Sequence, residues 1–459
     1  MRTGLHRVML RPWVLLTAAL LGACVVIVGW PGSSGSEAPV TAQPTCDAEV
    51  ATEPGVVLTD RGVLRGERSG ETYVFRGIPY AAPPVGELRW RPPSEHDCWT
   101  GERAATEFGP ICPQLNAQRE VVGDEDCLTL NVWTPAAPPA APLPVMLFIH
   151  GGGNSQGAGS LPLYDGQRLA EQGDVVLVTL NYRLGPLGFL AHPTLDAESA
   201  TGASGNYGIL DQIAALRWVQ RNIAAFGGDP SRVLIFGESG GAVDTCVLLA
   251  SPLAAGLFQR ALMESGACLG PGMQGAAASG PRFVAASPCA GVTDVPACLR
   301  GLDTAAVMAV LPPTVSVSGG GGNQYGPVID GHVLPDAPLR MIQAGTHNHV
   351  PFAIGANADE TARDVPPIGS EEAYRAALER MLGPSLAPVV AAAYPPAEYG
   401  GPRQALVAAT SDARFICTAR TAARAVAANQ SEPVYRYFFT QALRGPAAAF
   451  GASHGLELA

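Results

Sequence analysis

The serine in Gly237-Glu238-Ser239-Gly240-Gly241 is the residue whose surroundings most clearly allow chemistry. An apolar run at residues 232–236 comes just before this segment, and a helix-like stretch at residues 242–250 comes just after it. A Gly-x-Ser-x-Gly turn between a buried strand and a helix needs small residues two before and two after the serine, because the strained backbone leaves no room for a Cβ. We therefore predict that Ser239 projects from a tight turn as a nucleophile, although an ordinary strand-to-helix turn has the same pattern.

A serine hydroxyl is a poor nucleophile alone, so it needs a base, an acid that orients the base, and donors for an oxyanion. His150-Gly151-Gly152-Gly153 follows a buried strand, and its glycines allow backbone N–H groups to point at a developing negative charge. Only His454 lies late in the chain, after an expected strand and among small residues. Asp359 and Glu360 both follow another strand end, and periodicity does not choose between them. The histidines downstream of the serine are His332, His347, His349 and His454.

The elements that must position these residues read as buried strands alternating with helices. Residues 128–133 alternate like a half-buried strand, and apolar runs typical of central strands lie at residues 145–149 and 175–180. Further strands are expected at residues 261–265, 350–355 and 434–439. Helical patterns lie at residues 210–226, 373–381 and 404–429. Short antiparallel strands are expected earlier, at residues 56–58, 62–64 and 72–75. The sequence therefore predicts an α/β protein with a mostly parallel sheet.

The composition favours a globular protein and excludes other classes. Hydrophobic residues make up 47% of the 459 residues and charged residues 15%, which excludes a disordered chain. The net charge of −11 argues against nucleic acid as a partner. No Cys-x-x-Cys or His-Glu-x-x-His motif occurs, so we expect no metal site and no other cofactor.

The N-terminus indicates export of the rest of the chain. Basic residues precede an apolar stretch at residues 13–30, which is about long enough to cross a bilayer. Residues 1–30 are expected to be an uncleaved anchor, a cleaved signal peptide, or a lipoprotein signal with a lipid on Cys24, because Leu21-Gly22-Ala23-Cys24 resembles a bacterial lipobox. Residues 31–45 are expected to be a flexible linker. The folded body would then be extracytoplasmic, secreted or anchored to the outer face of the membrane.

Several further motifs stand in one order along the chain: Phe75-Arg76-Gly77-Ile78-Pro79-Tyr80-Ala81, Glu125-Asp126-Cys127-Leu128-Thr129-Leu130-Asn131-Val132-Trp133, Asn181-Tyr182-Arg183, Gly205-Asn206-Tyr207-Gly208, Phe226-Gly227-Gly228-Asp229-Pro230, the serine turn, and residues 451–457. In these motifs and their order the chain resembles the type B carboxylesterase family, which includes cholinesterases, fungal lipases and bacterial esterases. The resemblance implies that residues 46–459 form an α/β-hydrolase domain, with a mostly parallel sheet, helices on both faces and a small N-terminal antiparallel sheet.

The resemblance implies a role for each candidate residue. The family pattern makes Glu360, rather than Asp359, the acid and His454 the base. The reaction implied is hydrolysis of a carboxylic ester through an acyl-enzyme on Ser239. The family usually has alanine after the nucleophile, where this chain has glycine. The implied oxyanion donors are the backbone N–H groups of Gly152, Gly153 and Gly240.

Export makes disulfides possible, and the resemblance suggests how the cysteines pair. It implies the bonds Cys112–Cys127 and Cys289–Cys298, and it leaves Cys46–Cys98 and Cys246–Cys268 as the remaining pairs. Cys417 is left over, since relatives often pair it with a C-terminal cysteine that is absent here. Only five residues follow His454, whereas family members continue for many tens of residues. We therefore expect a domain without its usual C-terminal end and a catalytic histidine on a terminus liable to fray.

The loop at residues 113–126 indicates the kind of substrate. It contains no aromatic ring of the type that faces a quaternary ammonium in cholinesterases, and it is too polar for a lipase lid. We expect small or medium soluble esters as the small-molecule partners. Membrane association would come through residues 13–30 or a lipid on Cys24. The alternative function is a surface-anchored binding or adhesion module of the same fold, with weak or no catalysis.

Overall fold

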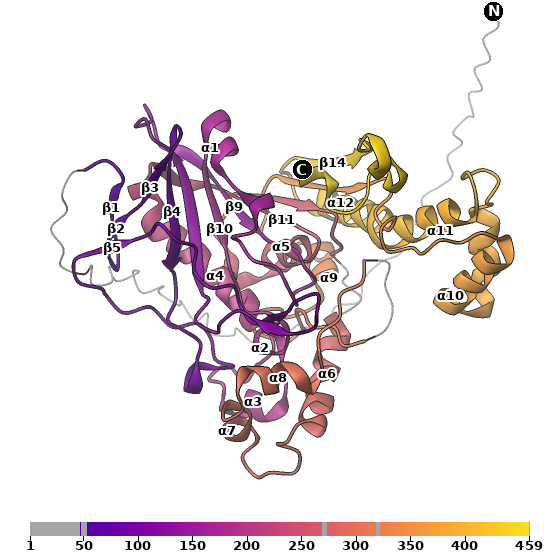
Figure 1. Ribbon diagram of the computed structural model, residues 1–459, viewed down its shortest axis with the longest axis horizontal. Coiled ribbons are helices and arrows are strands. Elements are labelled where there is room, and N and C mark those ends of the chain that lie inside the picture. Colours follow the sequence, from indigo (N-terminus) through magenta and orange to yellow (C-terminus); the bar gives the residue numbers. More distant parts are fainter. Residues whose placement is uncertain (1–45, 47–52, 269–272, 318–321, 459) are drawn as a thin grey trace, which may run out of the picture. The chain divides into compact units, whose positions relative to one another are not determined.

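The computed structural model describes residues 46, 53–268, 273–317 and 322–458 (Figure 1). The expected signal or anchor at residues 1–30 and the expected linker at residues 31–45 lie outside the described residues. Within the part of the chain that is described, no helix is both long and apolar enough to span a membrane.

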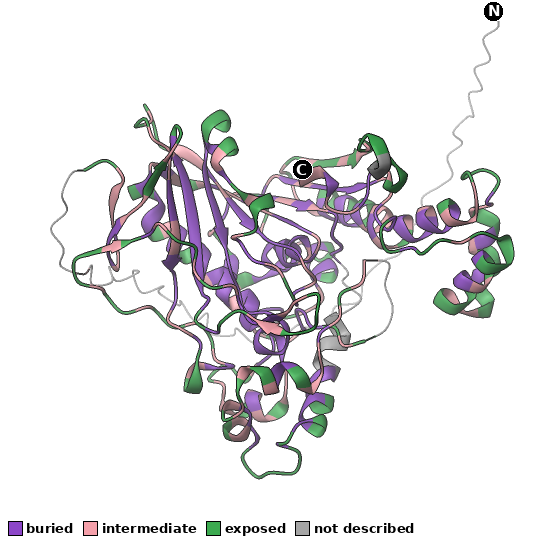
Figure 2. Cartoon of the chain, viewed as in Figure 1, coloured by how far each residue is buried: buried purple, intermediate pink, exposed green. Residues whose placement is uncertain are grey.

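A nine-stranded sheet organises the fold, in the order β14-β13-β12-β11-β9-β10-β8-β4-β3 (Figure 1). The six strands from β14 to β10 are parallel to one another, whereas β8, β4 and β3 are added as antiparallel neighbours. Apolar runs form these strands because both faces of the central ones are buried (Figure 2). The bounds are β3 Glu67–Ser69, β4 Thr72–Pro79, β8 Thr129–Pro135, β9 Leu143–Ile149, β10 Val176–Leu180, β11 Gly228–Glu238, β12 Arg260–Glu264, β13 Phe352–Asn357 and β14 Val434–Phe439.

The middle of this sheet brings two loops together. Strand β9 lies between β10 and β11 and is parallel to both, with Phe148 opposite Phe236. Chain connections therefore leave β9 and β11 in opposite directions along the sheet, and a crevice at the carboxyl ends of such strands is where α/β proteins bind ligands. The glycine loop after β9 and the serine turn after β11 both start at this edge.

Helices cover both faces of the sheet. The main core packs α4, α5, α9 and α12 against one face, on side chains such as Val145, Val178 and Ile235. On the other face α1 packs against Trp133 and Leu177. The helix bounds are α1 Gln167–Gly173, α2 Gly185–Phe189, α3 Pro193–Glu198, α4 Tyr207–Asn222, α5 Gly240–Ala250, α6 Met273–Ala286, α7 Val295–Arg300, α8 Thr304–Val310, α9 Pro338–Gln343, α10 Glu371–Ala393, α11 Pro402–Ser411 and α12 Cys417–Asn429.

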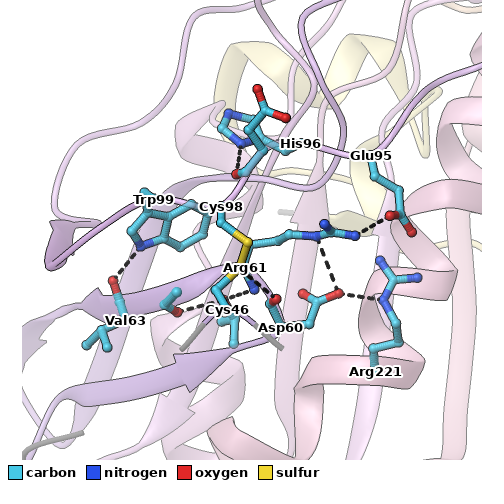
Figure 3. Close-up of a disulfide and its surroundings, with 12 residues drawn as sticks. Cys46, Asp60, Arg61, Val63, Glu95, His96, Cys98, Trp99 and Arg221 are labelled. Atoms are coloured by element: carbon cyan, nitrogen blue, oxygen red, sulfur yellow. Dashed lines mark hydrogen bonds and ion pairs between the residues drawn. A yellow bond between two sulfur atoms is a disulfide. The ribbon is translucent and has the colours of Figure 1, made fainter. Parts of the chain in front are cut away.

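The small N-terminal sheet has the order β1-β2-β5, with β1 and β2 antiparallel and β5 parallel to β2. Strand β4, expected beside β1 and β2, instead belongs to the large sheet, where it pairs with β8. The Cys46–Cys98 disulfide fastens the first described residue near this sheet (Figure 3). Next to it, Arg221 of α4 is paired with Asp60 at 2.7 Å. The bounds are β1 Val56–Thr59, β2 Gly62–Arg65, β5 Glu102–Ala104 and, for a separate hairpin, β6 Gln114–Leu115 and β7 Val121–Val122.

Candidate active site

Ser239 lies on a sharp turn between β11 and α5. Its backbone angles are φ 55° and ψ −116°, a strained combination for a residue with a Cβ. The positions two before and two after the serine have no room for a side chain. A Cβ on Gly237 would lie 2.5 Å from the carbonyl carbon of Gly241. A Cβ on Gly241 would lie 1.9 Å from the carbonyl oxygen of Ile149. The turn therefore holds the serine at the carboxyl edge of the sheet, as the pattern predicted.

The glycine loop after β9 faces this turn. Gly152 and Gly153 have φ of +102° and +59°, values that L side chains rarely adopt. The backbone N–H groups of Gly152, Gly153 and Gly240 donate no hydrogen bond to any described residue. A Cβ on Gly240 would lie 2.8 Å from the nitrogen of Gly153. Glycine at position 240 thus lets the loop approach the start of α5 closely and bring N–H donors from two elements together.

The turn after β13 supplies the carboxylate that contacts His454. Oε2 of Glu360 lies 2.6 Å from Nδ1 of His454, and its Oε1 accepts a hydrogen bond from the Asn357 N–H at 2.7 Å. Glu360 is 1% exposed, so the carboxylate and imidazole meet away from solvent. Asp359 points elsewhere and accepts a hydrogen bond from the Ala452 N–H at 3.0 Å. Of the two acids that periodicity left open, Glu360 is the one that reaches the imidazole.

The other ring nitrogen of His454 faces Glu238, the residue before the serine. Nε2 lies 3.1 Å from Oε1 of Glu238, and there is no hydrogen bond between Ser239 and His454 among the described residues. Neither atom has a hydrogen-bond partner among the described residues, so this contact is an ion pair only when His454 carries a proton. Burial raises the pKa of Glu238 to about 7, against the opposing effect of His454. Burial lowers the pKa of His454, but the carboxylates of Glu238 and Glu360 outweigh this and raise it to about 9.

Hydrogen bonds hold the segment that carries His454 against β12 and β13. The His454 N–H donates to the carbonyl of Glu360 at 3.2 Å. The side chain of Asn357 donates to the carbonyl of Ser453 at 2.9 Å and also to the carboxylate of Glu457. Ser265 donates to Glu457 at 2.8 Å. The segment expected to fray is therefore tied to the sheet at several points.

A cavity of about 480 Å³ opens over these groups. Ser239, His454 and Gly153 line it, together with Phe415 and Arg414 from the segment between α11 and α12. The ring of Phe415 lies 5.1 Å from the imidazole of His454, centroid to centroid. This volume is within the range of small-molecule sites.

Sequence patterns did not indicate three of the residues that the structure adds to the site: Glu238, Phe415 and Arg414. Glu238 lies at the variable position of the Gly-x-Ser-x-Gly pattern, which gives no hint of its partner. Phe415 and Arg414 lie in a helical pattern more than 170 residues after the serine, and nothing in their spacing points to the cavity.

The described residues form four disulfides, and their partners are the four expected pairs: Cys46–Cys98, Cys112–Cys127, Cys246–Cys268 and Cys289–Cys298. Cys246–Cys268 ties α5, which follows the serine, to the segment after β12. Cys112–Cys127 closes the loop that contains the β6–β7 hairpin. Cys417 is a free thiol.

Known proteins are similar to this chain in sequence. A family model described as the carboxylesterase family matches residues 53–459. Fumonisin B1 esterase of Sphingopyxis macrogoltabida is 39% identical over 387 residues, covering 81% of this chain and 67% of that protein. Para-nitrobenzyl esterase of Bacillus subtilis (strain 168) is 40% identical over 354 residues, covering 74% of this chain and 70% of that protein.

Solved structures of an esterase have the same fold as this chain. A structure of PNB esterase superposes with a TM-score of 0.74 at 36% identity, covering 88% of this chain and 84% of that one. Nothing in these matches favours the alternative of a binding or adhesion module. The chain therefore belongs to the carboxylesterase family, with its α/β-hydrolase fold, and is a hydrolase of carboxylic esters.

Proposed function

We propose that the protein hydrolyses small or medium soluble esters through an acyl-enzyme formed on Ser239. The observation that carries this proposal is the convergence of three features on one cavity. These are a serine on a strained turn, a histidine 2.6 Å from a buried glutamate, and the N–H groups of Gly153 and Gly240, which have no acceptor among the described residues. A serine hydrolase needs a nucleophile, an oriented base and oxyanion donors.

In the proposed mechanism, Nε2 of His454 accepts the proton of Ser239 as Oγ attacks the ester carbonyl. The imidazole must first lose the proton that the carboxylate of Glu238 favours, because only an unprotonated Nε2 accepts the serine proton. The carbonyl oxygen then gains negative charge, which the N–H groups of Gly152, Gly153 and Gly240 stabilise. Glu360 keeps the imidazole oriented and stabilises its protonated form.

The alcohol leaves with the proton that His454 took from the serine. Water then attacks the acyl carbonyl as His454 accepts one of its protons. The bond between the acyl carbon and Oγ of Ser239 breaks, His454 returns the proton to Oγ, and the acid leaves. The cavity of about 480 Å³ supports substrates of small or medium size. No step needs a metal ion or an organic cofactor.

Hydrolysis of 4-nitrophenyl acetate and butyrate tests this function. The wild-type protein, with its disulfides intact, should release 4-nitrophenolate. Ser239→Ala should lower turnover by about a millionfold, to the limit of detection, because members of a triad act as a unit. Ser251→Ala is a matched control at the end of α5, a position that does not line the cavity. A folded wild-type protein without activity would instead favour the binding module.

The location of the protein also belongs to the proposal. Four disulfides support an oxidising compartment, which agrees with an extracytoplasmic protein, either secreted or associated with the membrane through residues 13–30 or a lipid on Cys24. Mass spectrometry of the mature N-terminus distinguishes a retained anchor, a cleaved signal and a lipidated cysteine. A reduced protein recovered from the cytoplasm would contradict the location.

A further inference from the structure

Arg414 places a positive charge in the wall of the cavity. Among the described residues that line this cavity, it alone carries a permanent charge, since the other side chains are neutral except for the titratable His454. The remaining wall is formed mainly by small and apolar groups, including Val243, Val315 and Phe415. A substrate that fills the space over Ser239 therefore meets a guanidinium.

The guanidinium of Arg414 has no protein partner among the described residues. Its Nε is buried without a hydrogen-bond acceptor, and none of the ion pairs in that part of the chain includes Arg414. The side chain is partly buried, and burial lowers its pKa by disfavouring the charged form, whereas the negative charge of Asp364 opposes this. Asp364 is itself engaged, since it accepts the Val317 N–H at 2.8 Å. A charge that has lost part of its water without gaining a hydrogen-bonded counter-ion is costly, unless a ligand supplies the counter-ion.

The local backbone explains why this side chain reaches the site. Asp412–Ile416 forms a π-helical turn between α11 and α12, and such turns occur frequently at functional sites. Three residues of this turn, Ala413, Arg414 and Phe415, line the cavity. The ring of Phe415 contacts the ring of His454, so the neighbouring residue Arg414 is held near the reacting groups.

We propose that Arg414 binds a carboxylate of the ester substrate, so that the enzyme prefers esters whose acyl or alcohol part carries a carboxylate. A guanidinium binds a carboxylate through two parallel hydrogen bonds, which fixes the orientation of the ligand as well as its position. The ester at the other end of such a substrate would lie toward Ser239. This inference rests on the proposed function, because it names the substrate class of the same site.

Matched pairs of esters test the inference. Monoethyl glutarate and monoethyl adipate are compared with ethyl pentanoate and ethyl hexanoate for a charge on the acyl part, and 4-acetoxybenzoate with its methyl ester for a charge on the alcohol part. Hydrolysis is followed in a pH-stat for the wild type, Arg414→Gln and Arg414→Lys. Arg424→Gln is the control, since Arg424 is exposed on α12 and does not line the cavity.

The wild type should prefer the anionic member of at least one pair. Arg414→Gln should lower kcat/KM for that member roughly 10- to 100-fold, because that is the loss in affinity expected when hydrogen bonds between charged groups are removed. The same variant should change kcat/KM for the neutral member less than about twofold. Arg414→Lys should retain part of the preference, and Arg424→Gln should retain all of it. An anionic-to-neutral ratio that is equal in the wild type and Arg414→Gln would overturn the inference.

The outcomes separate this inference from the proposed function. Neutral esters that are hydrolysed without any charge preference refute the role of Arg414 alone, whereas failure to hydrolyse every ester refutes both. If Arg414→Gln does not fold, inhibition of the wild type decides. Glutarate and adipate should inhibit hydrolysis of a neutral ester at least tenfold more strongly than their uncharged diamides do, and equal inhibition by acid and diamide would refute the inference.

Discussion

Replacement of Glu238 by glutamine should move the pH dependence of ester hydrolysis to lower pH. In the structure, Oε1 of Glu238 lies 3.1 Å from Nε2 of His454, the nitrogen that must be unprotonated to accept the proton of Ser239. The neighbouring carboxylates overcome the effect of burial and raise the pKa of His454 to about 9. Activity of the wild type should therefore rise with pH through the neutral range, as His454 loses its proton.

The size of the shift follows from the geometry. At an effective dielectric constant of about 20, a full charge 3.1 Å from the imidazole contributes ~5 kcal/mol, and one pKa unit corresponds to about 1.4 kcal/mol. Glu238 carries only part of its charge near neutrality, because burial raises its own pKa to about 7. Since Glu360 also remains in the variant, we expect Glu238→Gln to lower the pKa of His454 by about 1 to 2 units.

The assay is kcat/KM for 4-nitrophenyl acetate, measured from pH 5.5 to 10 with correction for spontaneous hydrolysis. Glu264→Gln is the matched control, because Glu264 is opposite Glu238 in the sheet but does not contact His454. Burial raises the pKa of Glu264 to about 8, so this side chain is largely neutral at pH 7. The reasoning would be refuted if kcat/KM rose at the same pH in Glu238→Gln and the wild type. It would also be refuted if the rise in the wild type occurred below pH 6.5.

Three further changes test other parts of the account. Gly240→Ala places a Cβ 2.8 Å from the nitrogen of Gly153, so the oxyanion loop must move; kcat should fall roughly 10- to 100-fold with little change in KM, and unchanged kcat would contradict the geometry. Burial raises the pKa of Asp244 to about 7, so its contribution to stability is present below about pH 4 and is lost as pH rises to 7; the fall in Tm from pH 5 to pH 8 should be smaller in Asp244→Asn, and an equal fall in both proteins would exclude Asp244 as a cause. Removing the Cys246–Cys268 bond, whose cysteines are 22 residues apart, with the double change to alanine should lower the free energy of unfolding in urea by about 3 kcal/mol, whereas an unchanged midpoint would show that the bond does not stabilise the fold.

The sequence predicted the sheet better than the helices. Each central strand is an apolar run, because a strand buried on both faces has no polar side to obscure it; residues 145–149 and 175–180 correspond closely to β9 and β10. Short helices such as α2 and α9 gave no signal, since a single turn or two contains too few residues to show a period. The helical pattern at residues 404–429 became α11, a π-helical turn and α12, a difference that apolar spacing does not reveal.

Prediction of the site depended on where its residues lie in the chain. The serine turn and the glycine loop are continuous segments whose backbone demands glycine, so their sequences are informative. The choice of Glu360 over Asp359 came from family resemblance, because neighbouring acids at a strand end have the same local pattern. Glu238 meets His454, and Arg414 reaches the wall of the cavity, only because folding brings distant segments together. Such contacts between distant segments have no periodicity to detect.

The central claim is that Ser239 is the nucleophile that forms the acyl-enzyme. Mass spectrometry of the protein treated with diethyl 4-nitrophenyl phosphate tests it most directly, since this reagent transfers its diethylphosphoryl group to an activated serine. The account predicts one added group per chain, located on the peptide that contains Ser239, and no addition to Ser239→Ala or His454→Ala over the same time. Addition to another residue, or equal addition to the wild type and Ser239→Ala, would contradict the claim.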